Sequence, residues 1–283
     1  MPQRLGHDFR PASSLTFAWG FVVAGASGCG GGLPLLYPAQ TLAAGDVRAA
    51  AGLSSDVATL GLSQATKAAS NEAAASGGTG PSGSDPTYAK GALATASIGT
   101  GIAPYVAARV GIGWDAEGGI TYTGRAVRGD IRRSFDLAPK VALSAGIGGS
   151  VVLYGRQDGE SLPGVDLQDL HGVGADLPVI VGYRSTAGLY MGWIGARAGF
   201  EHVGISALTS EPGTTTFGGP PIALSATRWW GGGLVGAAAG FRHVHVAMEL
   251  DVSYADVSGN YNETRARVDG VTLAPSAALL WDF

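Results

Sequence analysis

Charged residues recur at every second position in several segments of this chain, where they alternate with apolar residues. Because successive side chains of a β-strand point to opposite faces, such a set would share one face of a sheet. Arginines and carboxylates gathered there could form ion pairs that close a lumen, or line a narrow polar pore. The set comprises Arg48, Arg109, Glu117, Arg128, Asp130, Arg132, Asp176, Arg184, Arg197, Glu201, Glu249 and Asp251.

A histidine beside a carboxylate would offer a different chemistry, general acid–base catalysis of hydrolysis. His171 has Asp166 and Asp169 close by in sequence, and His202 follows Glu201 directly. The strand pattern places both histidines near one rim of the predicted sheet. Loop histidines are more often simply solvated, and no motif flanks these two, so no catalytic residue is assigned.

Cofactor and metal chemistry find little support in the residue types. The chain has 1 Cys and 5 His, which excludes an intrachain disulfide and a Cys-based zinc site and makes a metal site improbable. Glycine clusters such as Gly111–Gly113 lack the strand-to-helix context of a phosphate-binding loop. We expect neither a metal nor a cofactor.

The composition is apolar, rich in glycine and poor in charge. Of 283 residues 47 are Gly; 46% are hydrophobic and only 14% charged, with a net charge of -4. This balance gives no basic footprint for nucleic acid. No apolar run of about 20 residues follows the N-terminal region, so hydrophobicity is spread over short segments, as in transmembrane β-barrels.

The N-terminus reads as an export signal. Arg4 and Arg10 precede the apolar segment 15–25, so we assign residues 1–28 as a signal peptide. The following Ala-Ser-Gly-Cys, ending at Cys29, resembles a bacterial lipobox, which implies lipidation at Cys29. Gly30 in place of Asp fits export to the outer membrane. Ordinary signal-peptidase cleavage is the alternative. Residues 29–45 are predicted to be a tether.

Residues 46–283 form the predicted barrel domain, because period-two alternation covers most of residues 102–283. Long and short connections alternate after residue 155, and a closed barrel with both ends on one side needs an even strand number. We favour ten strands over eight. The ten strands are 46–54, 102–112, 117–123, 126–135, 139–154, 172–184, 188–202, 226–241, 244–257 and 270–283.

Two features interrupt this pattern. Residues 55–75 switch to a three- and four-residue period and predict a helix, in the first outer loop or inside the lumen. Residues 155–171, 203–225 and 258–269 are predicted as polar outer loops.

The C-terminal segment VTLAPSAALLWDF alternates and ends in Phe283. It resembles the last strand of bacterial outer-membrane β-barrel proteins, with Trp281 and Phe283 as the assembly signal. This resemblance implies an all-β, closed, antiparallel up-and-down transmembrane barrel in the outer membrane. It also implies contact with outer-membrane lipid and with the barrel-assembly machinery.

Three functional hypotheses remain. The favoured one is an outer-membrane barrel with a structural, surface-exposed or narrow-pore role and a charge-lined interior. The second is an outer-membrane hydrolase with a rim His/carboxylate site. The third is a lipid-anchored soluble β-sandwich, since such a fold would alternate as well.

Overall fold

The computed structural model describes residues 32–76, 85–155, 162, 165, 167–205 and 223–283. The predicted signal peptide and Cys29 lie outside the described residues.

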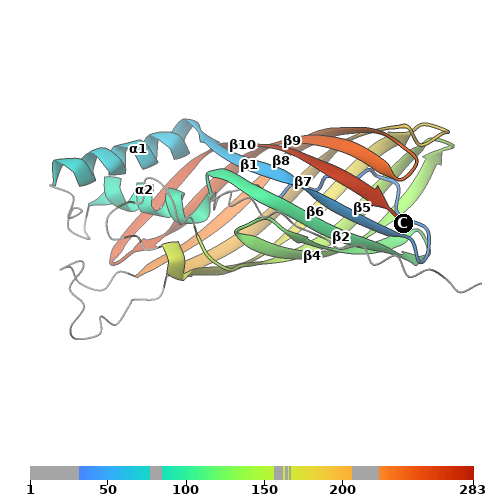
Figure 1. The fold of residues 1–283 in the computed structure, drawn as a ribbon. Coiled ribbons are helices and arrows are strands. Elements are labelled where there is room, and N and C mark those ends of the chain that lie inside the picture. The colour runs from blue at the N-terminus through green and yellow to red at the C-terminus, as the bar shows by residue number, and fades with distance from the viewer. Residues whose placement is uncertain (1–31, 77–84, 156–161, 163–164, 166, 206–222) are drawn as a thin grey trace, which may run out of the picture.

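Ten antiparallel strands form one closed barrel, in which β1 pairs with both β2 and β10 (Figure 1). This confirms the closed barrel with ten strands and shows the soluble sandwich to be wrong, because the sheet closes on itself. The strands are β1 Val47–Thr59, β2 Gly101–Gly113, β3 Ala116–Tyr122, β4 Ala126–Ala138, β5 Val141–Val152, β6 Leu170–Arg184, β7 Tyr190–Ile205, β8 Leu224–Phe241, β9 Val244–Tyr261 and β10 Thr264–Asp282.

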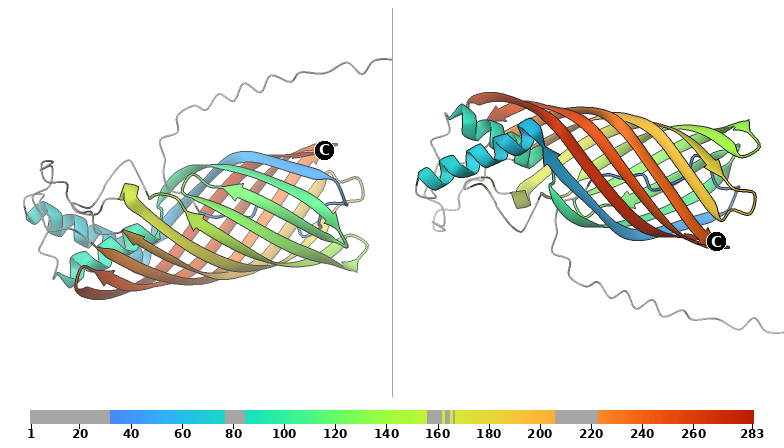
Figure 2. Two further views of the ribbon diagram at one scale, coloured as in Figure 1. Left: turned by 90° about the horizontal axis from the view of Figure 1, so that it is seen from below. Right: turned by 90° about the horizontal axis from the view of Figure 1, so that it is seen from above.

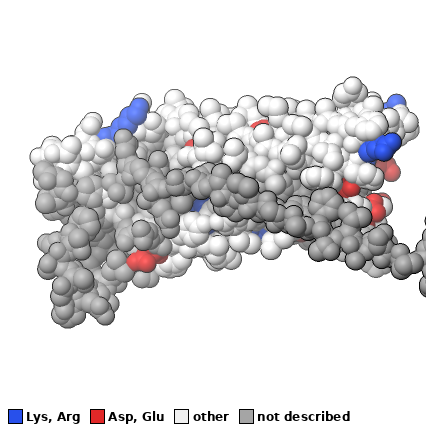
Figure 3. All heavy atoms as spheres, viewed as in Figure 1, with Lys and Arg blue, Asp and Glu red and all other residues white. Residues whose placement is uncertain are grey.

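The apolar face of each strand points away from the lumen. In β9, Val246, Met248 and Leu250 are 54%, 64% and 40% exposed, whereas the intervening Ala247 and Glu249 are buried. A water-soluble sheet would place these residues the other way round. On the face seen in Figure 3, the charged side chains in view gather mainly toward the two ends of the barrel. An apolar belt facing outward suits a hydrocarbon environment.

Exposed aromatic side chains flank this belt at two levels. Near the turns that join β8 to β9 and β6 to β7 lie Phe241 and Tyr190, with Trp281 on the last strand. At the other level Phe200 and Trp229 are register partners with ring centroids 5.4 Å apart. Two aromatic girdles around an apolar band are typical of barrels that cross a bilayer.

The two ends of the barrel differ. The short-turn end carries the tight connections β2–β3, β4–β5, β6–β7 and β8–β9, together with the C-terminus (Figure 1). The long-loop end carries both helices, the connections β5–β6 and β7–β8, and the β9–β10 hairpin (Figure 2). No described helix is long and apolar enough to cross a membrane.

The helical part differs from the prediction. β1 continues to Thr59, so the helix expected at 55–75 is α1, Leu60–Ala75, and a second helix, α2, spans Pro86–Ser97. Asp85 caps α2 by accepting hydrogen bonds from the backbone N–H groups of Thr87 and Tyr88. The two helices pack closely because Gly91 has no Cβ, which would collide with Ala69. They lie at the long-loop end, where α1 packs against β1 and β10 and α2 packs against β7 to β10. The buried residues of α2 share a cluster with the inward-facing Val203, Ala226 and Val257.

The prediction of a polar loop at 258–269 is also wrong. β9 and β10 stay paired up to Tyr261 and Thr264. Its charged side chains, such as Arg267, face outward, while Val257 and Val268 on the other face are buried in a cluster with both helices. A buried apolar face therefore holds this hairpin in the sheet beyond the aromatic girdle.

Candidate functional site: the occupied lumen

Residues 32–45, here called the lumen segment, run through the barrel instead of forming a tether beneath it. Leu35, Leu36 and Tyr37 are each 1% exposed, and Ala39 is fully buried. With the inward side chains of eight strands they form one buried cluster. The segment therefore fills the lumen as a core would, which an eight- to ten-stranded barrel otherwise achieves with side chains alone.

The barrel wall recognises the N–H groups of this segment through carboxylates. Glu249 accepts hydrogen bonds from the backbone N–H of Leu35 at 2.7 Å and of Leu36 at 3.0 Å, and from the Trp193 indole at 2.8 Å. Glu117 accepts the N–H of Leu42 at 2.9 Å. Buried N–H groups need partners, and these strands supply them.

Side-chain donors of the wall bind the carbonyl groups in the same way. Arg132 donates to Pro38 O at 2.6 Å, and the Tyr105 hydroxyl donates to Leu35 O at 3.0 Å. Arg197 also donates to a backbone carbonyl of the segment, that of Leu33. The wall therefore binds an extended peptide mainly through its backbone.

One side chain of the lumen segment, that of Tyr37, occupies a specific binding position. The guanidinium groups of Arg109 and Arg132 both contact the Tyr37 ring, each 4.1 Å from its centroid. A cation over an aromatic face is attracted by the ring quadrupole, more strongly where water is excluded. Tyr37 thus fixes the segment in one register.

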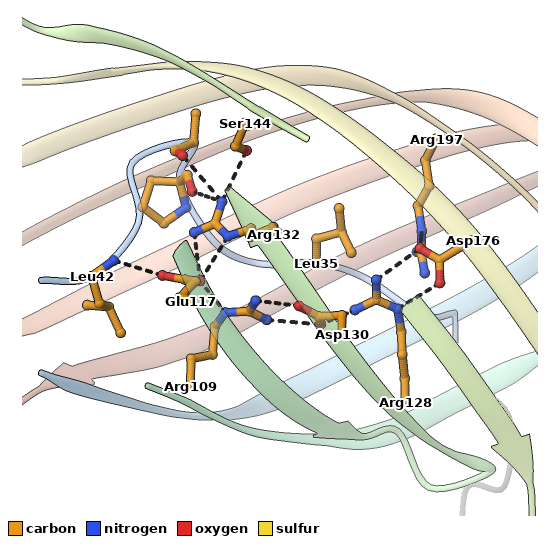
Figure 4. A network of polar contacts seen from close by, with 12 residues as sticks. Leu35, Leu42, Arg109, Glu117, Arg128, Asp130, Arg132, Ser144, Asp176 and Arg197 are labelled. Carbon is orange, nitrogen blue, oxygen red and sulfur yellow. Dashed lines mark hydrogen bonds and ion pairs between the residues drawn. The ribbon is translucent and has the colours of Figure 1, made fainter. Parts of the chain in front are cut away.

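Seven inward side chains form a continuous chain of ion pairs behind the segment (Figure 4). Each charge in it has at least one opposite neighbour, as burial of ionised groups requires. Gly148 on β5 lets Arg128 reach Asp176, since a Cβ there would lie 2.6 Å from the Arg128 Cζ. The order is Arg132, Glu117, Arg109, Asp130, Arg128, Asp176 and Arg197.

A second charged cluster lies toward the long-loop end. Glu201 pairs with Arg125 at 3.1 Å and with Arg228 at 3.4 Å. A cavity of about 30 Å³ lies beside them, lined also by Asp56 and Thr123. It has room for a single water molecule, and one oxygen of each of these two residues is buried without a partner among the described residues.

Of the twelve charged residues predicted to face the interior, Arg48 is buried and pairs with Asp282. Ten of the other eleven lie inside the barrel wall. Arg184 differs, because it is the last residue of β6 and reaches the open mouth at the short-turn end. There it lines a cavity of about 500 Å³ with Gln40 and Lys140 and makes no ion pair among the described residues. The inside residues are Arg109, Glu117, Arg128, Asp130, Arg132, Asp176, Arg197, Glu201, Glu249 and Asp251.

Sequence reasoning missed several partners of the network. Arg125 lies between the predicted strands 117–123 and 126–135, and Asp56 lies within the predicted helix 55–75. Trp193 and Tyr105 lie on the inward parity of their strands, which could have revealed them. Nothing in the alternation of the strands signals that residues 32–45 return into the lumen.

The predicted rim site does not assemble. His171 and His202 are exposed on the outer face, where their ring nitrogens contact the Asp169 backbone carbonyl and the Thr227 hydroxyl. Glu201 points to the opposite face of the same strand and is buried in its ion pairs. Among the described residues neither imidazole contacts a carboxylate. Asp166 lies outside them.

The remaining predicted residues have simpler positions. Trp281 and Phe283 are exposed on the outside at the short-turn end, where the Phe283 backbone pairs with Val47. Within the described part of the chain, no group of three or more His, Cys, Asp or Glu side chains could hold a metal ion.

The chain matches no protein-family model and no curated protein. One similar solved structure is the outer membrane protease OmpT from Escherichia coli, at 10% identity over 87% of this chain and 100% of that chain, with a TM-score of 0.37. Another is OccAB4 from Acinetobacter baumannii, at 8% identity over 66% of this chain and 54% of that chain, with a TM-score of 0.18. In its closed ten-stranded barrel the chain resembles outer-membrane β-barrel proteins.

Proposed function

We propose that this chain is an integral outer-membrane β-barrel protein that is closed by its own N-terminal segment and has a structural, surface-exposed role. The observation that carries the proposal is the lumen segment, which is bound at its backbone by Glu249, Arg132 and Glu117. A barrel whose interior is filled by this segment and by a continuous chain of ion pairs offers no continuous water path. The narrow-pore role is therefore disfavoured for this state.

The membrane location rests on the outward apolar belt and the two aromatic girdles. In barrels of this architecture the short turns face the periplasm and the longer connections face outside. The helices α1 and α2 and the β9–β10 hairpin would then form the exposed surface. The C-terminal residues Trp281 and Phe283 would engage the barrel-assembly machinery in the periplasm.

Electrophoresis of boiled and unboiled outer-membrane fractions tests the barrel. A folded barrel that resists detergent migrates faster than its boiled form. A protein that fractionates as soluble and shows no mobility shift would contradict the membrane assignment.

Planar-bilayer recording then tests closure. We expect the full chain to be silent and a variant lacking residues 33–42 to conduct, because the deletion removes the buried Leu35 and Tyr37. A variant of the exposed hairpin turn, Asn262→Ala with Glu263→Ala, is the control and should stay silent. A steady current from the full chain would support the narrow pore instead.

A further inference from the structure

The lumen segment crosses the barrel in one direction. Gly32 lies next to Ser55 and Ala274, and with Thr123 and Arg125 of the β3–β4 turn it lines the small cavity at the long-loop end. The β3–β4 turn is the outer rim of that side of the wall. The described chain therefore begins at the level of this rim, inside the barrel.

From there the contacts descend in sequence order. Leu33 meets Arg197 in the middle of β7, and Leu35 meets Glu249 in the lower third of β9. Pro38 then meets Arg132 in the middle of β4, and Leu42 meets Glu117 beside the β2–β3 turn.

The lower contacts complete the passage. The Gln40 amide donates to Lys140 O beside the β4–β5 turn at 3.4 Å. Gly45 donates its N–H to Gly111 O beside the β2–β3 turn at 2.9 Å. Asp46 then leads directly into β1, which runs back up the wall.

The lumen has no room for the residues before Gly32 to run back toward the short-turn end. Leu35, Leu36 and Tyr37 are packed against the wall at 1% exposure, and the cavity beside Gly32 measures only about 30 Å³. A second strand of polypeptide would need the space that these side chains occupy.

We propose that the barrel carries its own N-terminal end through its lumen, so that the chain preceding Gly32 leaves at the long-loop end, on the cell surface. This rests on the proposed outer-membrane orientation. The barrel thereby displays the start of the mature chain outside, although the four turns of the short-turn end and the C-terminus stay in the periplasm. Cleavage after residue 28 would leave three residues before Gly32 to be displayed.

Epitope insertion tests this topology in cells that express the full chain. One variant carries a short epitope directly before Gly32. A surface control carries it in the hairpin between Asn262 and Glu263, and a periplasmic control carries it in the β8–β9 turn between Arg242 and His243. Antibody binding is measured on intact and on permeabilised cells, and the mobility shift of each variant on gels reports folding.

The proposal expects the epitope before Gly32 to bind antibody on intact cells as the hairpin epitope does, with no further gain on permeabilisation. The β8–β9 turn epitope should bind only after permeabilisation. If the Gly32 epitope instead behaves like the turn epitope while the hairpin epitope is exposed, the threading is wrong and the outer-membrane barrel stands.

If the hairpin epitope itself is hidden on intact cells, the orientation assumed under the proposed function fails, and the threading proposal fails with it. If the Gly32 variant loses its mobility shift, it has failed to fold, and intact cells that express the unmodified protein are treated with protease instead. N-terminal sequencing of the unmodified protein then decides. Residues before Gly32 are trimmed if they are outside and untouched if they are in the periplasm.

Discussion

The backbone N–H of Leu35 donates a hydrogen bond of 2.7 Å to the Glu249 carboxylate, although 214 positions separate the two residues in sequence. Glu249 is fully enclosed by the lumen and has no arginine within ion-pair distance in the described structure. Its charge is balanced by three N–H donors instead. This carboxylate is thus dedicated to holding the lumen segment.

Replacing Glu249 with Gln should loosen the segment. The amide has one acceptor oxygen and places an NH₂ group against N–H donors, so at least one buried donor loses its partner, at a cost of about 1–3 kcal/mol. We expect a lower free energy of unfolding in a urea titration of the micelle-bound protein, and intermittent bilayer currents. Glu263→Gln, at an exposed turn, is the matched control. Equal stability of the two variants would show that Glu249 does not hold the segment.

Tyr37→Ala should open the lumen more directly. It removes the ring that Arg109 and Arg132 contact and so deletes two buried cation–π contacts, each worth up to about 2 kcal/mol when desolvated. The measurement is single-channel recording, with open events expected where the parent is silent. Tyr190→Ala, at a position 64% exposed in the aromatic girdle of the short-turn end, should leave the recording unchanged. A silent Tyr37→Ala barrel would mean that the backbone contacts suffice for closure.

The buried and the exposed ion pairs should differ sharply in their effect on stability. Asp176 is buried between Arg128 and Arg197, and Asp176→Asn leaves these guanidinium groups short of a counter-charge, at a cost of about 3–5 kcal/mol. Asp256 pairs with an Arg267 that is 70% exposed, so Asp256→Asn should cost at most about 1 kcal/mol. Urea titration of both variants in micelles checks the ratio. Comparable losses would refute a structural role for the buried network.

Acylation of Cys29 gives a separate test of the N-terminal signal. Metabolic labelling with a radioactive fatty acid should mark the parent chain, and Cys29→Ala should abolish the label. Three residues reach only about 10 Å, so an acyl group on Cys29 would enter the membrane leaflet nearest Gly32. An unlabelled parent protein of the mature mass would favour ordinary signal-peptidase cleavage.

Strand positions followed from the sequence because each strand carries its own evidence. In 244–257, Val246, Met248 and Leu250 alternate with residues that are mostly polar. Because lipid lies outside the barrel and ion pairs lie inside, the apolar face of such a strand must point outward. The helices were harder to predict. The first residues of the predicted helix belong to β1 instead, because β1 pairs with β2 up to Asp56 and with β10 up to Thr59. No local sequence pattern shows this pairing. The hairpin at 258–269 looked polar because only its outward residues are charged.

By itself, the sequence favoured a closed barrel of ten strands over one of eight and identified most of the charged residues that face its interior. These depend on period, parity and composition, which are local properties of the chain. Only the tertiary structure decided what fills the barrel. Whether Asp176 meets Arg128, whether Arg184 is buried, and whether residues 32–45 hang below the barrel or pass through it all depend on contacts between residues far apart in sequence. The extended lumen segment has no alternating pattern of its own, and its partners are assembled only when the barrel closes around it.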